Sequence, residues 1–227
     1  MSVRVSVSQA ALRANLSGSD QGSVLDLRAD AWGHGLRAVA EAVRAETSAT
    51  ALVDPHAAAS LIDAGFPADR IVTAVVPTVP GERLYGLDGP GVPVMRLNGG
   101  VISSKELKAG EGVSYGYRYR ATRDTRIALV SGGYADGVVR GLGGRIAVTI
   151  GDARCPVLGR VAMDVCVVEI GDADVRRGDV VWYFGDPAEG HPPVAEWAVH
   201  TGASAAEIVA TVGRLAGRAP GVRRSDP

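Results

Sequence analysis

Lysine is almost absent from this sequence of 227 residues. Only Lys105 and Lys108 are lysines, and the other basic residues among the 24 are arginines. An arginine guanidinium stays protonated and delocalised, so it does not form a Schiff base with a carbonyl compound. Any chemistry that needs a side-chain amine therefore has two candidates along the chain.

Cysteine is equally scarce. Cys155 and Cys166 are too few for a disulfide framework, and their spacing matches no zinc signature. We therefore predict two buried structural thiols and no metal site. The net charge of −1 argues against nucleic acid or a membrane surface as a partner. No apolar run reaches ~18 residues and no secretory signal opens the chain, so we expect a cytoplasmic protein.

The first part of the chain alternates short strands with helices, which is typical of parallel βα units. Residues 83–87 are a candidate further strand, because they follow the breakers Pro77, Pro80 and Gly81. The other expected strands are 24–27, 49–53 and 70–76, and the helices expected between them are 36–45 and 57–64.

From about residue 93 the pattern changes to strand-like runs separated by glycine turns. No long helix is expected before 194–200 and 205–215. This half is typical of an antiparallel β domain. The expected organisation is a βα domain at 10–91, a β domain made of 1–9 and 92–220, and a disordered arginine-rich tail at 221–227.

Several segments occur in an order that resembles one known family. They include Arg-Ala-Asp-Ala-Trp-Gly-His-Gly, Gly-Val-Ser-Tyr-Gly, Gly-Tyr-Ala-Asp-Gly and Gly-Arg-Val-Ala-Met-Asp, which occupy 28–35, 112–116, 133–137 and 159–164. With similar segments at 5–16, 84–87 and 197–213, they resemble alanine racemases over nearly the whole chain. The resemblance implies a barrel that binds pyridoxal phosphate (PLP), followed by a β domain.

The βα part is too short for a complete barrel of that kind. An eight-stranded βα barrel needs roughly 200 residues or more, whereas 10–91 leaves room for 3–4 parallel strands with helices. By the resemblance, the missing piece lies between Pro77 and Val79. We therefore expect an α/β plus β fold, in which a truncated βα-barrel remnant packs on the antiparallel β domain. An open sheet of this size needs a partner or cover at its edge.

Four positions depart from the family pattern. Arg28 stands at the position of the cofactor lysine. Trp32 replaces a tyrosine whose hydroxyl would hold the cofactor phosphate, and an indole offers only an N–H donor. Val79 stands where the arginine facing the pyridine nitrogen is expected, and Ala206 where a tyrosine is expected. We therefore expect no covalently bound PLP and no other cofactor.

Three residues are the catalytic candidates. Tyr115 aligns with the second catalytic base of the family, which implies action across a homodimer interface. A tyrosine with a pKa near ~10 needs a cation beside it to act as a base, and Arg28 could be that cation if the two meet. Asp164 ends a turn that, by the resemblance, meets the substrate carboxylate and the partner. The alternatives are a packed Tyr115 ring and an Asp164 that only binds nearby amides.

Five residues are the candidates for substrate binding. Tyr134 aligns with a tyrosine at the active-site mouth, and Met163 precedes Asp164. Asp30, Trp32 and His34 follow a strand end, where βα folds place ligands, and together with Arg28 they could form an anion site. The alternatives are that Arg28 pairs with Asp30 or Asp26 and that His34 only packs or caps.

These observations leave three functional interpretations. The first is a repurposed cofactor-independent enzyme of secondary metabolism that tailors a small molecule, with a pocket between the two domains and at a homodimer interface. The second is a non-catalytic binding or assembly protein that pairs with itself or with a true racemase. The third is residual alanine racemase activity, which the chemistry disfavours because no electron sink remains for the carbanion.

Overall fold

The computed structural model describes residues 3–87 and 91–218. The expected tail at 221–227 lies outside this part of the chain. The fold has two compact units. Within the described residues, one comprises 7–87, 91–95 and 209–214, and the other comprises 3–6, 96–208 and 215–218.

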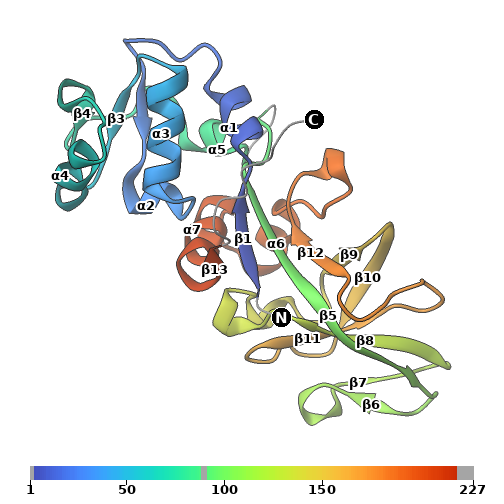
Figure 1. Ribbon diagram of the computed structural model, residues 1–227. Coiled ribbons are helices and arrows are strands. Elements are labelled where there is room, and N and C mark those ends of the chain that lie inside the picture. Colours follow the sequence, from blue (N-terminus) through green and yellow to red (C-terminus); the bar gives the residue numbers. More distant parts are fainter. Residues whose placement is uncertain (1–2, 88–90, 219–227) are drawn as a thin grey trace. The chain divides into compact units, whose positions relative to one another are not determined.

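The first unit is built on a three-stranded sheet of order β2-β3-β4 in which both strand pairs are parallel (Figure 1). Its elements are β2 (Val24–Asp26), β3 (Thr50–Leu52), β4 (Ile71–Val72), α1 (Gln9–Leu16), α2 (Arg28–Trp32), α3 (Leu36–Glu46), α4 (Pro55–Asp63), the 3₁₀ helix η1 (Ala68–Arg70) and α5 (Gly81–Tyr85).

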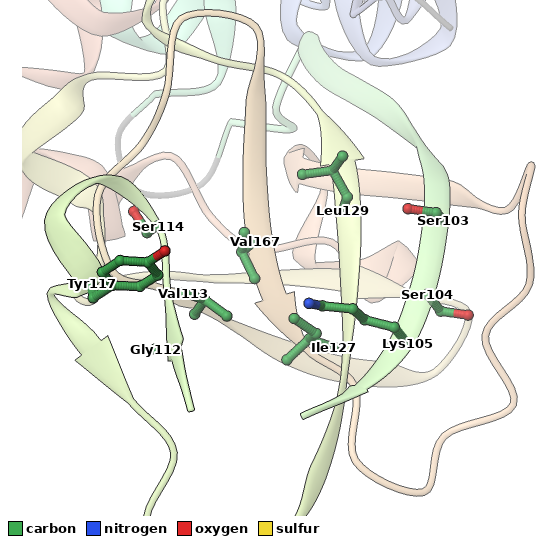
Figure 2. A pocket seen from close by; sticks show the side chains of 10 residues that line it. All are labelled: Ser103, Ser104, Lys105, Gly112, Val113, Ser114, Tyr117, Ile127, Leu129 and Val167. Atoms are coloured by element: carbon green, nitrogen blue, oxygen red, sulfur yellow. The ribbon is translucent and has the colours of Figure 1, made fainter. Parts of the chain in front are cut away.

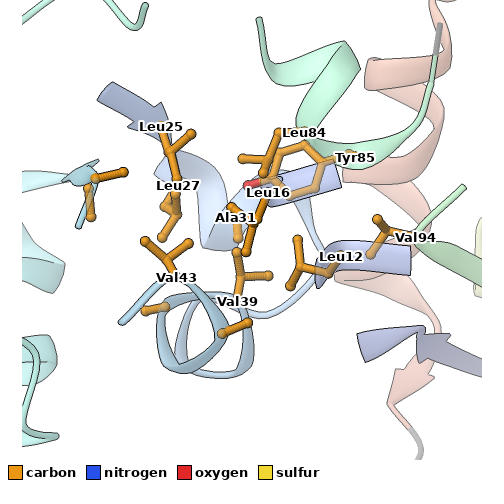
Figure 3. Packing of buried hydrophobic residues seen from close by; sticks show 14 of the residues in the cluster. Leu12, Leu16, Leu25, Leu27, Ala31, Val39, Val43, Leu84, Tyr85 and Val94 are labelled. Atoms are coloured by element: carbon orange, nitrogen blue, oxygen red, sulfur yellow. The ribbon is translucent and has the colours of Figure 1, made fainter. Parts of the chain in front are cut away.

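The pattern of apolar residues explains how this unit forms its core. Helix α3 buries Val39 and Val43, which lie one turn apart and share a face. They pack with Leu25 and Leu27 from the end of β2, and all four are fully buried (Figure 3). Helix α4 starts with Pro55 at its first position, where the missing N–H costs nothing.

The candidate strand at 83–87 is wrong, because this segment forms helix α5. Pro80 precedes the helix, and Gly86 ends it with φ +64, a conformation that suits glycine. Leu84 and Tyr85 are fully buried. The neighbouring Val79 instead forms a parallel bridge with Leu25 of β2.

The second unit is an antiparallel β domain, as the sequence predicted. Strands β12-β9-β10-β11-β8-β5 follow one another, and an additional β12–β5 pairing closes them into a ring of six. Each pair within this ring is antiparallel. The strands are β5 (Met95–Leu107), β8 (Thr125–Ser131), β9 (Ala147–Ile150), β10 (Ala153–Leu158), β11 (Val165–Glu169) and β12 (Val180–Phe184).

Shorter elements complete the domain. Strand β1 continues the sheet beside β5 and pairs in parallel with β13, and β6 and β7 form a separate hairpin. These elements are β1 (Arg4–Val7), β6 (Gly112–Val113), β7 (Tyr119–Arg120), β13 (Gly217–Arg218), η2 (Tyr115–Tyr117), η3 (Tyr134–Asp136), η4 (Arg140–Leu142), η5 (Pro187–Glu189), α6 (Ala195–Thr201) and α7 (Ala205–Leu215), the last of which contributes to both units.

Strand β5 runs through two glycines that resemble a turn in the sequence. A Cβ atom at Gly99 would lie 2.3 Å from the carbonyl oxygen of Ser131. The Ser131 hydroxyl lies 2.9 Å from the amide nitrogen of Gly100, which donates to it. The glycines therefore let β8 approach β5 closely and do not mark a break. Among the described helices, none has the length and apolarity that crossing a membrane would need.

Gly132 is expected to be essential for the stability of the β domain. Its φ is +125, and an added Cβ would lie 2.4 Å from the hydroxyl of the fully buried Tyr183. We expect Gly132→Ala to lower the free energy of unfolding by about 3 kcal/mol, through overpacking and an unfavourable φ. The measurement is urea denaturation followed by circular dichroism.

Gly151→Ala is the matched control for this substitution. Gly151 also has a positive φ of +57, but nothing lies within 4 Å of the added Cβ. We expect it to cost only about 1 kcal/mol, the usual penalty of the left-handed conformation. Equal losses for the two variants would contradict the packing argument.

Candidate functional site

Arg28, the first residue of α2, is held by Asp26, the last residue of β2. Its Nε lies 2.9 Å from Oδ1 of Asp26 and its Nη2 lies 2.6 Å from Oδ2, so the pair is bidentate. Asp26 is 4% exposed. Burial alone would raise the pKa of Asp26, but the hydrogen bonds and charge of Arg28 outweigh it and lower that pKa. Of the two pairings expected for Arg28, the one with Asp26 is found.

The turn after Arg28 has an unusual backbone. Ala29, Asp30, Ala31 and Trp32 all have positive φ, between 51° and 59°, so they form one left-handed turn. For residues other than glycine this costs roughly 1–2 kcal/mol per residue. Such strain persists only where surrounding groups impose it, and it concentrates at functional sites.

Two carboxylates stabilise this turn. Oδ2 of Asp54 accepts a hydrogen bond of 2.8 Å from the amide of Ala29. Oδ1 of Asp30 accepts one of 2.7 Å from the amide of Leu36, at the start of α3. Asp30, a candidate binding residue, therefore has a structural partner close to its own turn. Sequence reasoning missed Asp54, because its partner lies in a different βα unit of the chain.

Trp32 and His34 pack around Tyr85. His34 is 1% exposed, its ring stacks on that of Tyr85 at 4.2 Å, and its Nδ1 donates to the carbonyl oxygen of Ala31 at 2.9 Å. The Trp32 ring fills the space beside Gly81, where a Cβ would lie 2.3 Å from it. The Tyr85 hydroxyl donates to the carbonyl oxygen of Asp26 at 2.9 Å. Sequence reasoning missed Tyr85, which links these residues.

Tyr134, Met163 and Asp164 come together in the β domain. The amide of Tyr134 donates to the carbonyl oxygen of Ala162 at 3.0 Å, and the amide of Gly132 donates to that of Asp164 at 2.9 Å. Tyr134 is 43% exposed and Met163 is 51% exposed. These candidate residues therefore form one exposed surface on two neighbouring turns.

Charged groups border this surface. The Arg140 guanidinium lies 5.9 Å from the centre of the Tyr134 ring. Burial, together with the negative charge of Asp164, raises the pKa of Asp136 despite its hydrogen bond from Gly133. A raised pKa makes Asp136 a candidate for proton transfer at this surface.

The segment that carries Tyr115 is fixed to the same region. The Ser114 hydroxyl donates to the carbonyl oxygen of Arg160 at 2.8 Å and accepts from the Arg160 amide at 2.7 Å. Tyr115 lies in the 3₁₀ helix η2, but its side chain lies outside the part of the chain that the structure describes. The expected meeting of Tyr115 with Arg28 stays a prediction, because the two residues lie in different units.

The βα unit does not fit a covalently bound PLP. No lysine lies within 7–95 or 209–214. The cation at the expected position, Arg28, is paired with Asp26. Lys108 pairs with Glu106 at 3.1 Å and with Asp124 at 3.2 Å, in the β domain. A lysine-bound cofactor therefore has no point of attachment in the βα unit.

A closed antiparallel β domain joined to a parallel βα unit defines the class of fold, and comparison with known proteins identifies the family. The family model described as "Alanine racemase, C-terminal domain" matches residues 94–219. The alanine racemase of Mycobacterium tuberculosis is 43% identical over 139 residues, which are 57% of this chain and 36% of that protein. That of Thermobifida fusca is 41% identical over 142 residues, or 60% and 38% of the two chains. The chain belongs to the alanine racemase family.

Solved structures agree on the fold. Alanine racemase from Clostridium difficile 630 has a TM-score of 0.80 at 17% identity, covering 96% of this chain and 95% of that one. The enzyme from Streptomyces lavendulae, a D-cycloserine producer, has a TM-score of 0.70 at 21% identity, covering 96% of both chains. The sequence match, in contrast, spans little more than a third of the length of the curated relatives.

Removing Arg28 is expected to reverse the direction in which the free energy of unfolding changes with pH. In the wild type the lowered pKa of Asp26 contributes stability above an unfolded pKa of about 3.9, which is lost as pH falls through the folded value. In Arg28→Met, burial raises the pKa of Asp26, so stability falls as pH rises above the unfolded value of about 3.9 toward the raised folded value. We expect a loss of roughly 2 kcal/mol near neutral pH, because Arg28 is half exposed.

Urea denaturation at several pH values measures this effect. The double variant Asp26→Asn/Arg28→Met removes the titrating group, so its stability should vary with pH no more than that of Asp26→Asn alone. A loss in Arg28→Met that stays constant from acid to neutral pH would show that the pair does not act in this way.

Proposed function

We propose that the protein is a non-racemising member of the alanine racemase family that works as a binding and assembly protein, as a homodimer. The single observation that carries the proposal is the bidentate Arg28–Asp26 pair at the position of the cofactor lysine. Racemisation through PLP uses the cofactor as an electron sink for the carbanion, and the cofactor is held by a lysine amine. An arginine guanidinium does not form a Schiff base, and that of Arg28 is already paired with Asp26.

The exposed turns of the β domain support an assembly role. Tyr134, Val139 and Met163 are each at least 40% exposed, and Arg140 lies over Tyr134. Tyrosine, methionine and arginine are enriched in protein interfaces. The resemblance implies that the turn with Met163 meets a partner subunit, and we propose a second copy of this chain in that place.

The parallel sheet supports the same proposal. We interpret the βα unit as a shortened barrel whose strand β4 is an outer strand of the three. Val75 and Val76, which follow β4, are 46% and 82% exposed. An outer strand of a short sheet, and exposed apolar residues near it, are stabilised when another chain covers them.

A second candidate function is a cofactor-independent enzyme that acts on a small molecule. Asp136 favours it, because burial and the charge of Asp164 raise its pKa, which favours a role as a general acid or base. Tyr115 and Asp164 would be the other acting groups. If the Tyr115→Phe variant retains every activity found for the wild type, this candidate fails.

The absence of lysine-dependent racemisation can be tested directly. We expect that PLP followed by borohydride reduction leaves no phosphopyridoxyl group on the protein after dialysis, measured by mass spectrometry of peptides. We also expect no exchange of the Cα hydrogen of L-alanine in heavy water with added PLP. Turnover together with a label on Lys105 or Lys108 would overturn the proposal.

The homodimer can be tested at Met163. We expect sedimentation equilibrium to give a dimer, and Met163→Asp to weaken it about tenfold or more by placing a charge in an apolar interface. Val199→Asp is the control, because Val199 is 79% exposed on helix α6 outside these turns. A wild type that stays a compact monomer at high micromolar concentration would exclude the assembly role.

A further inference from the structure

A pocket of about 260 Å³ opens on one face of the β domain. Strands β5, β8 and β11 form its floor, and the segment from β6 to η2 forms its opposite wall (Figure 2). Its lining belongs to one unit, and the described side chains that line it include none of the candidate site residues. That volume is large enough for a small organic molecule.

Strand register places the floor residues side by side. Ser103 lies opposite Leu129, which in turn lies opposite Val167, and Lys105 lies opposite Ile127. Directly opposite residues of antiparallel strands have side chains on the same face. The floor is therefore an apolar surface with Lys105 and Ser103 along its β5 border.

The wall is formed by the turn that follows β6. Tyr117 has a φ of +46 and packs on the backbone of Gly112, where a Cβ would lie 2.7 Å from its ring. The Tyr117 side chain is 66% exposed and borders the opening. Val113 packs with Leu107 and Ile127 in a small buried cluster that closes one end of the pocket.

Lys105 differs from the other lysine in its surroundings. Lys108 makes ion pairs with Glu106 and Asp124. The side chain of Lys105 has no ion pair or hydrogen bond within the described residues, and Figure 2 shows its amine extending over the pocket. The carboxylate of Glu169, across the sheet from Ile127, accepts instead from the hydroxyl of Thr125.

We propose that this pocket binds an organic anion, a carboxylate carrying an aliphatic or aromatic group, with Lys105 as its counter-ion. The amine would pair with the carboxylate, while Leu129 and Val167 contact the apolar group. The hydroxyls of Ser103 and Tyr117 add hydrogen-bonding groups at the border. The inference does not rest on the proposed function, because it concerns a different site and needs neither a partner nor a cofactor.

Phenylbutyrate is a suitable probe, and neutral phenylbutyramide is its matched control. An NMR titration of the backbone amides should show saturable shifts at Ile127, Leu129 and Val167, with a Kd in the millimolar range. Lys105→Met should weaken phenylbutyrate binding about fivefold or more, since it removes the charge-assisted contact. Lys108→Met removes the same charge three residues away and should leave the Kd unchanged.

Tyr117→Asn tests the wall without disturbing the backbone, because asparagine tolerates a positive φ. It should weaken phenylbutyrate and phenylbutyramide by similar factors, whereas Lys105→Met should affect only phenylbutyrate. Equal losses from the two lysine variants, equal affinities of wild type for the acid and the amide, or the absence of shifts at the floor residues would each overturn the proposal. The unfolding temperature of each variant shows that the fold is intact.

Discussion

Four consecutive residues with left-handed backbone, from Ala29 to Trp32, connect the first parallel strand to helix α3. At roughly 1–2 kcal/mol each, their conformation costs about 4–8 kcal/mol. The carboxylates of Asp30 and Asp54 each accept a backbone hydrogen bond there. Charged acceptors of this kind contribute about 1.5–3 kcal/mol each, so the two offset most of the cost. The turn persists because the side chains of Asp30 and Asp54 accept these hydrogen bonds.

These contacts limit the chemistry available in the βα unit. Asp26 is bound to Arg28, Asp30 and Asp54 hold backbone amides, and His34 is buried against Tyr85. Groups that a family comparison would regard as active-site residues maintain the shape of a strained turn in this chain. The same residues thus explain both why the turn survives and why we propose a role other than lysine-dependent catalysis.

The sequence predicted the broad fold because the spacing of apolar residues and the positions of glycine and proline are local signals. Closely spaced apolar residues predicted α3, and glycine turns between β-branched runs predicted the antiparallel domain. It failed at 83–87, where Pro80 and Gly86 cap a helix although the residues between them suit a strand. It also failed to anticipate the unbroken β5, because the close approach of Ser131 to Gly99 is a tertiary contact. The Arg28–Asp26 pair was among the alternatives, since a cation and a carboxylate two residues apart in the sequence are close enough to pair. The contacts of Asp54 and Tyr85 were not, because their partners lie far away in the sequence.

Lysine distribution connects these observations. Both lysines lie in the β domain, on a strand and turn of the same sheet, and among the described residues carboxylates neutralise Lys108 but not Lys105. In the βα unit, basic side chains are all arginine or histidine, which bind anions but form no Schiff base. The chain therefore carries the Lys105 amine in the part that the family model matches, outside the βα unit. Its ligands are therefore best sought where that amine borders an apolar floor.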